Sequence, residues 1–245
     1  LNPTGTVFKR QELEKICDMV LEENNRRSGD EKKLYVMYDQ MYWTLTFGDT
    51  VHYNPLSLRP EMKDYTIFID GISKAFAATG VRVGWALGPE NVLSKMKSIN
   101  SHLGAWSPMA EQHATAKFLL EGKVIDAYFK NYKKELSERL HLIYEGFQKL
   151  KSEGFSVDAC APQAAIYLTI QLDLTSKRTN NGDLISTQSD VTSYILNEAK
   201  LAVVPFYAFG ASKDSDWYRL SVGTCKKEEI PAMLAQLREA LSKLK

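Results

Sequence analysis

The chain has 245 residues, of which 44% are hydrophobic and 25% are charged, and its formal net charge at pH 7 is +1. This length supports one large domain or two modest ones, and the composition is that of a globular protein. The balanced charge gives no support for a nucleic-acid partner, which a basic patch would indicate. No apolar run approaches the ~18 residues that indicate a membrane-spanning helix.

The cysteines and histidines give no sign of a metal centre. Cys17, Cys160 and Cys225 are far apart and odd in number, and the four histidines have no metal-ligand spacing. This pattern fits neither a disulfide framework nor a zinc site. We therefore expect no bound metal, and we expect a reducing, cytoplasmic location.

The first half of the chain alternates predicted helix with predicted strand. It opens on the turn residues Leu1-Asn2-Pro3-Thr4-Gly5 without an initiating methionine, and we expect it to be the C-terminal part of a longer protein. Apolar residues at helical spacing predict a helix over 9–27. Short apolar runs predict buried strands at 34–39, 65–69 and 81–87. This alternation predicts an α/β fold with a mainly parallel sheet covered by helices on both faces.

The second half changes in character after Pro108. Helical patterns cover 109–120 and 124–151, and the second is long enough to bridge two domains. Strands are expected at 166–172, 201–206 and 217–222, with helices at 187–199 and at the C-terminus. We expect an α+β domain here, and we place the division between the two domains at residues 122 and 123.

Polar residues that can carry chemistry follow the predicted strands, where ligands bind in open α/β sheets. Asp39 and Tyr42 follow the first strand, Ser73 and Lys74 follow the second, and Arg82 lies at the third. A lysine amine can form an imine with an aldehyde, and a guanidinium group matches the oxygens of a phosphate. The segment Trp43–Tyr53 is expected to form a hairpin that exposes His52.

Four motifs together resemble the fold type I pyridoxal-phosphate enzymes, specifically the class I/II aminotransferases of aspartate aminotransferase type. They are Asn-Pro-Thr-Gly at 2–5, Asp-x-x-Tyr at 39–42, Ser-Lys-x-Phe-x-x-Thr-Gly-x-Arg-x-Gly at 73–84 and Tyr-Arg-Leu-Ser at 218–221. Their order and spacing match the family as well. One departure is Gly71, where relatives often carry a serine that contacts the phosphate.

The resemblance implies a role for each matching residue. Lys74 would hold pyridoxal 5'-phosphate as a Schiff base and then act as the base at the substrate Cα, with Asp39 and Tyr42 as further catalytic groups. Asp39 would pair with the pyridine nitrogen, while Tyr42 and Asn2 would contact the phenolic oxygen. Ser73 and Arg82 would bind the phosphate. Arg219, together with Asn2, would bind the substrate, and the guanidinium group would hold the α-carboxylate.

The resemblance also implies an architecture. Residues 1–122 would be the C-terminal part of the large cofactor-binding domain, and residues 123–245 would be a bridging helix and a small C-terminal domain. Relatives build their active sites at a dimer interface, so a homodimer is expected. Because the N-terminal part of such enzymes helps to bind the phosphate, we expect the 245 residues alone to bind cofactor poorly and to be inactive.

The function implied is transfer of an amino group from an amino acid, of aspartate type, to a 2-oxo acid. A lyase or synthase of the same fold would keep all of these residues and stays open as an alternative. A non-catalytic regulatory or interaction module is the second alternative. Its weakness is that a purely structural role requires none of Lys74, Asp39, Tyr42 and Arg219.

Overall fold

The structure is a computed structural model that describes residues 1–245, and the chain folds into two compact units. One unit is Val7–Tyr128, and the other combines Leu1–Thr6 with Phe129–Lys245. The units divide inside the long helix α6 (Gly122–Ser152), between Tyr128 and Phe129. The assignment of the units to a large and a small domain stays a prediction.

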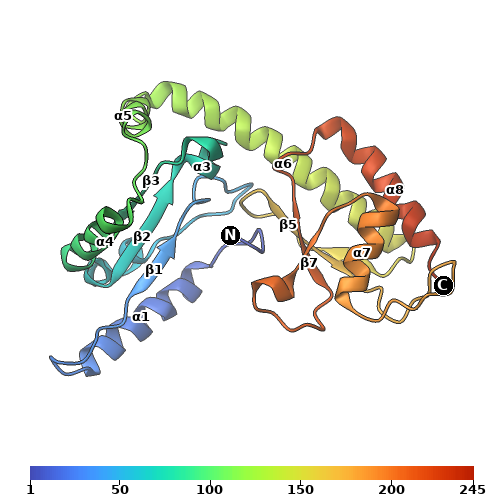
Figure 1. Ribbon diagram of the computed structural model, residues 1–245, viewed down its shortest axis with the longest axis horizontal. Coiled ribbons are helices and arrows are strands. Elements are labelled where there is room, and N and C mark those ends of the chain that lie inside the picture. Colours follow the sequence, from blue (N-terminus) through green and yellow to red (C-terminus); the bar gives the residue numbers. More distant parts are fainter. The chain divides into compact units, whose positions relative to one another are not determined.

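A three-stranded sheet forms the centre of the unit Val7–Tyr128 (Figure 1). Its strands are β1 (Val36–Asp39), β2 (Thr66–Gly71) and β3 (Gly84–Leu87), in the order β1-β2-β3. β1 runs parallel to β2, whereas β3 is antiparallel to β2. The sheet within this chain is therefore mixed, because residues 72–83 return the chain through two short helical turns and not through a full crossover helix.

Among the helices of this unit, α1 contributes several buried side chains to the core. α1 (Arg10–Arg26) packs Leu13, Cys17 and Val20 against Met62, with Val36 and Tyr38 of β1 beside them. The remaining helical elements are α2 (Pro55–Leu58), η1 (Pro60–Asp64), α3 (Ile72–Ala75), η2 (Thr79–Val81), α4 (Glu90–Leu103) and α5 (Met109–Phe118). Here α4 is an addition to the predicted elements, and it contains no buried residue.

The predicted hairpin at 43–53 is wrong. The segment forms a series of turns, such as the one closed by the hydrogen bond from Leu45 N to Tyr42 O at 2.9 Å, and contains no named strand. Leu45 and Phe47 are both buried. Two residues at this spacing would share one face of a strand, so the sequence pattern suits a hairpin. In the structure the backbone hydrogen bonds at both residues close turns instead, because Leu45 N donates to Tyr42 O and Thr50 N donates to Phe47 O.

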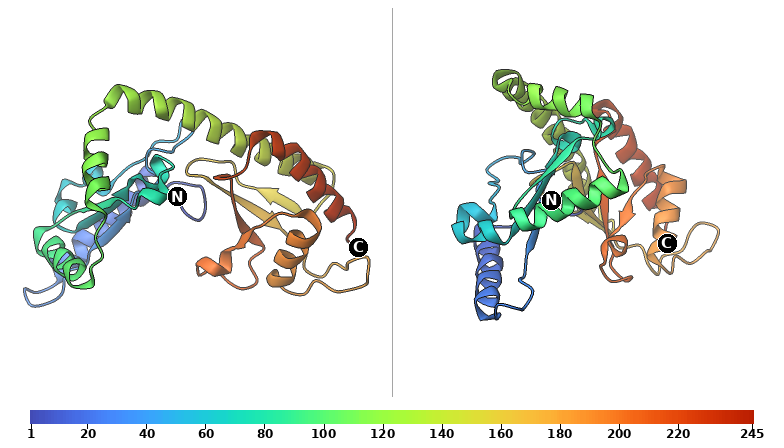
Figure 2. Two further views of the ribbon diagram at one scale, coloured as in Figure 1. Left: turned by 45° about the horizontal axis from the view of Figure 1, so that its top comes forward. Right: turned by 60° about the vertical axis from the view of Figure 1, so that its left-hand side comes forward.

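The other unit contains a four-stranded antiparallel sheet in the order β4-β5-β7-β6. The strands are β4 (Val157–Ala159), β5 (Tyr167–Leu172), β6 (Val204–Pro205) and β7 (Trp217–Ser221). Helices α7 (Gln188–Ala199) and α8 (Ile230–Ser242) lie side by side, as both figures of the whole chain show (Figures 1 and 2). Two short turns, η3 (Phe206–Phe209) and η4 (Lys227–Glu229), complete the unit. The predicted α+β content is confirmed.

The core of this unit is formed by the sheet, the second half of α6 and α7. Its fully buried side chains include Leu136, Leu140, Ile143, Phe147, Leu168, Ile170, Leu172, Ile195 and Tyr218. Each aliphatic side chain of this size contributes roughly 1.5–3 kcal/mol when it is buried. α8 passes close to α6 at Gly146, where an added Cβ would lie 2.3 Å from Leu234 Cδ1.

The longest helix, α6, has 31 residues and contributes to both units. Its buried residues all lie between Leu136 and Leu150, in the part that belongs to the second unit. Neither α6 nor any other helix combines the length and apolar composition that crossing a membrane requires.

Candidate functional site

The predicted site residues fall into two groups, one in each compact unit. The unit Val7–Tyr128 contains Asp39, Tyr42, Ser73, Lys74 and Arg82, and the other unit contains Asn2 and Arg219.

The parallel pairing of β1 and β2 brings the first group to one edge of its sheet. Tyr38 is aligned with Phe68 and Asp39 with Ile69, so the two strands end close together. β2 then leads directly into α3, which carries Ser73 and Lys74. The carboxyl ends of neighbouring parallel strands are where α/β sheets bind ligands.

Lys74 is half-buried and its amine is free of protein partners. It lies in the short helix α3, and its Nζ forms no hydrogen bond or ion pair. The next turn is held by Phe76, whose ring centroid lies 5.3 Å from that of Phe118 and 5.8 Å from that of Tyr128. The lysine is thus presented on an anchored segment with its amine available for a ligand.

Ser73 and Arg82 line the same cavity, which has a volume of about 360 Å³. Arg82 ends the turn η2 in a left-handed conformation with φ of 61°. Its Nη1 donates a hydrogen bond to Thr79 O at 2.8 Å, and no carboxylate pairs with it. A hydroxyl and an unpaired guanidinium group from two different loops therefore meet at one cavity, which is an arrangement suited to an anion.

Asp39 and Tyr42 differ in their exposure. Asp39 is exposed; its Oδ1 accepts a hydrogen bond from Met41 N at 3.1 Å, and its Oδ2 forms no hydrogen bond. Tyr42 is only 5% exposed. One carboxylate oxygen of Asp39 is therefore free to accept from a ligand, while Tyr42 is fixed by its surroundings.

The departure at Gly71 has a steric cause. A Cβ at this position would lie 2.8 Å from Val83 O and 2.9 Å from Gly84 Cα, both of them backbone atoms. The backbone N–H of Gly71 donates to Asp70 Oδ1 at 2.7 Å. A serine therefore does not fit here, and the amide that could have replaced its contact is already bonded within the protein.

Sequence reasoning assigned no role to Asp70 or to the residues that bind it. Asp70 is buried at the end of β2, and its Oδ2 accepts hydrogen bonds from Trp43 Nε1 at 3.0 Å and from Gln40 Nε2 at 3.3 Å. Burial raises the pKa of the Asp70 carboxyl, and these hydrogen bonds oppose the rise. The signal that could have identified it is an aspartate in an otherwise apolar buried strand.

His52 is half-buried, so its predicted exposure is wrong. Its ring centroid lies 5.9 Å from that of Tyr38 and 6.3 Å from that of Trp43, and its Nε2 is buried without a hydrogen-bond partner. Burial lowers the pKa of His52. The inward packing of the 43–53 loop explains this position.

Arg219 is the centre of the second group. It lies on β7, aligned with Thr169 of β5. Its Nη1 donates a hydrogen bond to Asn2 Oδ1 at 2.8 Å, and its guanidinium carbon lies 4.4 Å from the ring centroid of Tyr167 and 4.8 Å from that of Phe209. Two aromatic rings and one amide thus fix the orientation of the guanidinium group.

The Nε atom of Arg219 is buried and has no hydrogen-bond partner. Buried donors are normally satisfied, so an orphaned one indicates a missing acceptor. A guanidinium group that is held in place with a donor left over is suited to a planar, two-oxygen acceptor such as a carboxylate.

The turn that carries Asn2 depends on Gly5. Gly5 has φ of +70°, and an added Cβ would lie 2.3 Å from Tyr167 O. Its carbonyl accepts a hydrogen bond from Ala164 N at 2.9 Å, and Thr4 O accepts one from Thr169 Oγ1 at 2.7 Å. These contacts attach the first turn to β5 and so bring Asn2 to Arg219.

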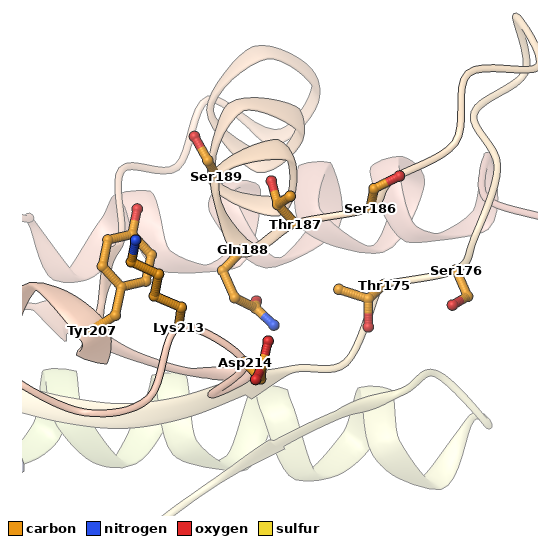
Figure 3. Close-up of a pocket in the computed structure, with 9 residues that line it drawn as sticks. All are labelled: Thr175, Ser176, Ser186, Thr187, Gln188, Ser189, Tyr207, Lys213 and Asp214. Atoms are coloured by element: carbon orange, nitrogen blue, oxygen red, sulfur yellow. The ribbon is translucent and has the colours of Figure 1, made fainter.

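A separate cavity of about 710 Å³ lies in the same unit and contains none of the predicted site residues (Figure 3). It is lined by Thr175, Ser176, Ser186, Thr187, Gln188, Ser189, Tyr207, Lys213 and Asp214. The backbone amides of Ser186 and Thr187 donate to Asp190, and Gln188 Oε1 accepts from the hydroxyl of Tyr218. These groups serve the start of α7, where Thr187 and Asp190 cap the helix, so we assign no chemistry to this cavity.

The chain resembles known proteins in both sequence and structure. Residues 1–237 match the family model for aminotransferase class I and II. The chain is 30% identical over 216 residues to an aspartate aminotransferase from Bacillus sp. (strain YM-2), covering 86% of this chain and 48% of that protein. The chain spans about half the length of the curated relatives that it matches.

Two solved structures give the likeness of fold. The aspartate aminotransferase from Rhizobium meliloti superposes with a TM-score of 0.83 at 24% identity, covering 100% of this chain and 56% of that one. An aromatic aminotransferase from Pyrococcus horikoshii OT3 gives a TM-score of 0.81 at 26% identity, covering 98% and 57%. The expected fold type I architecture is thereby confirmed. Because the family model matches almost the whole chain, the chain belongs to the aminotransferase class I and II family.

Proposed function

We propose that the protein is a pyridoxal-phosphate-dependent aminotransferase, which moves an amino group from an amino acid to a 2-oxo acid. The observation that carries this proposal is the half-buried Lys74, which has no protein partner and directly follows Ser73 in α3. Ser73, its neighbour in the chain, lines one cavity together with Arg82. An amine next to an anion site suits a cofactor that carries both an aldehyde and a phosphate.

The predicted site residues have hydrogen-bonding groups without a protein partner, and these groups match the chemistry of this cofactor. The Arg82 guanidinium group has no carboxylate partner, Asp39 Oδ2 has no hydrogen bond, and Arg219 Nε is buried without an acceptor. Arg82 would donate to the phosphate, and Arg219 would donate to a substrate carboxylate. Asp39 Oδ2 would accept from the protonated pyridine nitrogen. Their chemistry is complementary to the cofactor and to an amino acid.

When it is bound, pyridoxal phosphate supplies the electron sink for chemistry at the amino-acid Cα. Lys74 would hold it covalently through Nζ, and the released amine would move a proton at Cα. Asp39 would keep the ring nitrogen protonated through its negative charge. Tyr42 and Asn2 would contact the phenolic oxygen, and Ser73 with Arg82 would bind the phosphate.

The substrate would be bound by its α-carboxylate on Arg219. The flanking rings of Tyr167 and Phe209 would keep the guanidinium group in its plane, so that both oxygens can be held at once. We propose an aspartate-type donor because the Bacillus relative is an aspartate aminotransferase. Transfer between an amino acid and a 2-oxo acid, a homodimeric assembly and a cytoplasmic location are further parts of this proposal.

The test is covalent labelling of the protein expressed from its own gene. Incubation with pyridoxal phosphate, borohydride reduction and peptide mass spectrometry should locate an adduct on Lys74. Lys74→Ala should abolish that adduct, whereas Lys63→Ala, an exposed lysine of the same unit, should leave it unchanged. Absence of an adduct on Lys74 would overturn the proposal and favour a non-catalytic module.

Product analysis separates transfer from elimination. With an amino donor and a 2-oxo acid acceptor, an aminotransferase yields a new amino acid and a new 2-oxo acid in equal amounts. A lyase or synthase of the same fold would release a fragment of the donor and leave the acceptor unchanged. The same labelling with the 245-residue chain alone tests the prediction that it binds cofactor poorly and is inactive.

A further inference from the structure

Asp70 joins two segments of the unit Val7–Tyr128 through one buried carboxylate. It is 7% exposed, and its two oxygens accept three hydrogen bonds. Gly71 N donates to Oδ1, while Trp43 Nε1 and Gln40 Nε2 donate to Oδ2. Gln40 and Trp43 lie outside β2, and Gly71 is its last residue. The carboxylate therefore binds the segments that flank the sheet and not the interior of β2.

The two segments that meet at Asp70 are those that carry the proposed cofactor ligands. Gln40 and Trp43 belong to the segment after β1, which also contains Asp39 and Tyr42. Gly71 begins the segment that leads to Ser73 and Lys74. One carboxylate therefore connects the groups proposed for the pyridine ring with those proposed for the imine and the phosphate.

A carboxylate is the side chain that satisfies this set of donors. An ionised aspartate offers acceptors on both oxygens and presents no donor. An asparagine of the same size would have one acceptor oxygen, and its amide would point donors at either the Gly71 N–H or the two side-chain N–H groups. Hydrogen bonds to a charged group are also stronger than those to a neutral one.

The charges near Asp70 act in opposite directions. The carboxylate of Asp39 raises the pKa of Asp70, as does burial, whereas the hydrogen bonds from Gly71, Trp43 and Gln40 lower it. Arg82 and Ser73 line the cavity that Asp70 also lines. On the adjacent strand, Trp85 is aligned with Asp70 and brings no charge.

We propose that Asp70 is a positioning residue, whose ionised carboxylate holds the Asp39–Tyr42 segment in register with the Ser73–Lys74 segment. The importance of this role for cofactor binding rests on the proposed function. The hydrogen bonds that connect the two segments through Asp70 do not depend on it. Asp70 acts through the residues it places.

The connection is tested by the indole N–H signal of Trp43 in a nitrogen–proton NMR spectrum, assigned from its loss in Trp43→Phe. In the unmodified chain this signal should shift with pH in a single step as Asp70 is protonated. The shift should vanish in Asp70→Asn and persist in Asp64→Asn, an exposed aspartate of the same unit. A Trp43 signal that does not respond to Asp70 would overturn the proposal.

The contribution of Asp70 to cofactor binding is tested by titrating the protein with pyridoxal phosphate. The quantity measured is the concentration at which half of the Lys74 side chains carry an adduct after borohydride reduction. Loss of a hydrogen bond to a charged group predicts weakening on the order of ten-fold for Asp70→Asn and more for Asp70→Ala. Trp43→Phe, which removes one donor and keeps the carboxylate, should weaken labelling less than Asp70→Asn. Equal labelling of all variants with correct folding would overturn the positioning role.

The two failures can be distinguished. If the unmodified protein does not label on Lys74, the proposed function fails, while the Trp43 signal still reports whether Asp70 connects the segments. If the unmodified protein labels and the Asp70 variants label equally well, the function stands and the positioning role is wrong. Amide hydrogen exchange in the helix α1, which contributes no donor to Asp70, identifies any variant that has lost its fold.

Discussion

Arg219 Nη1 donates a hydrogen bond to Asn2 Oδ1 at 2.8 Å, so the first turn of the chain and a late strand build one binding element together. The two residues are 217 positions apart in the sequence. The Tyr167 and Phe209 rings flank the same guanidinium group. Its orientation is therefore fixed before any ligand arrives, which lowers the conformational entropy lost on binding.

Replacing Arg219 with lysine should strongly weaken the use of amino-acid substrates. Lysine keeps the charge but cannot offer two parallel donors to a carboxylate. We expect kcat/KM for the amino donor to fall by ~100-fold, which corresponds to ~2.7 kcal/mol of lost transition-state stabilisation. Steady-state kinetics over a range of donor concentrations measures the effect.

The matched control is Arg238→Lys. Arg238 is also an arginine of this unit, but it forms an exposed ion pair with Glu153 and has no connection to Asn2. We expect its kcat/KM to stay at the unmodified value. If Arg219→Lys and Arg238→Lys behaved alike, Arg219 would not bind the substrate carboxylate.

Phe209→Ala should loosen the Arg219 guanidinium group without removing it. A cation–π contact contributes ~0.5–2 kcal/mol, so KM for the amino donor should rise by about two-fold to thirty-fold. Phe206→Ala removes the ring of the same turn η3 that packs edge-on against Phe209, with centroids 6.3 Å apart, and keeps the Phe209 ring itself. An equal rise in KM for both variants would show that the turn, and not the ring over Arg219, determines binding.

Most of the fold was predictable because buried strands and amphipathic helices leave strong periodic patterns. The strand before Ser73 and the helix α1 are of this kind, whereas β1, which was predicted to be buried, alternates half-buried with exposed residues and leaves Met37 71% exposed. The loop at 43–53 was not predictable, because its alternating apolar residues have the pattern of a strand but pack as a turn. Tertiary packing, which sequence periodicity does not report, decides between the two.

The candidate site also contains residues that the sequence predicts and residues that it does not. The residues with family motifs, such as Lys74 and Arg219, were identifiable from the sequence. An aspartate in an apolar strand could have singled out Asp70, but its connection to Gln40 and Trp43 was not predictable, because it requires two segments 27 or more positions apart to meet at one carboxylate. Such a contact leaves no local spacing that a single sequence can reveal.

Gly71→Ser should destabilise the protein although many relatives carry a serine there. Its Cβ would lie within 2.9 Å of two backbone atoms, which cannot move aside as a flexible side chain would. Overpacking of this kind costs ~1–3 kcal/mol, which urea unfolding would measure. Gly80→Ser, nine residues further along the chain, where an added Cβ has nothing within 4 Å, should change stability by under ~0.5 kcal/mol. Equal stability of the two variants would contradict the steric explanation of Gly71.

Tyr38 should make the stability of the protein depend on alkaline pH. Its hydroxyl donates a hydrogen bond to Tyr53 O at 2.5 Å, and burial raises the pKa of Tyr38 from 10.0 to about 12. Between these values the unfolded phenol is ionised while the folded phenol keeps its proton. The folded state then binds more protons, so stability falls as pH rises from the unfolded pKa towards the folded one.

The prediction is best measured as a difference between the unmodified protein and Tyr38→Phe. Below about pH 10 the variant should be less stable by ~1 kcal/mol, because Tyr53 O loses its donor. As pH rises to about 12, the difference in the free energy of unfolding should change by ~1–2 kcal/mol in favour of Tyr38→Phe. This value allows for the weakening of the effect by solvent, because the Tyr38 ring is partly exposed. Tyr35→Phe removes a hydroxyl without a hydrogen bond and controls for general loss of a tyrosine. A difference that stayed constant across this pH range would contradict a raised pKa for Tyr38.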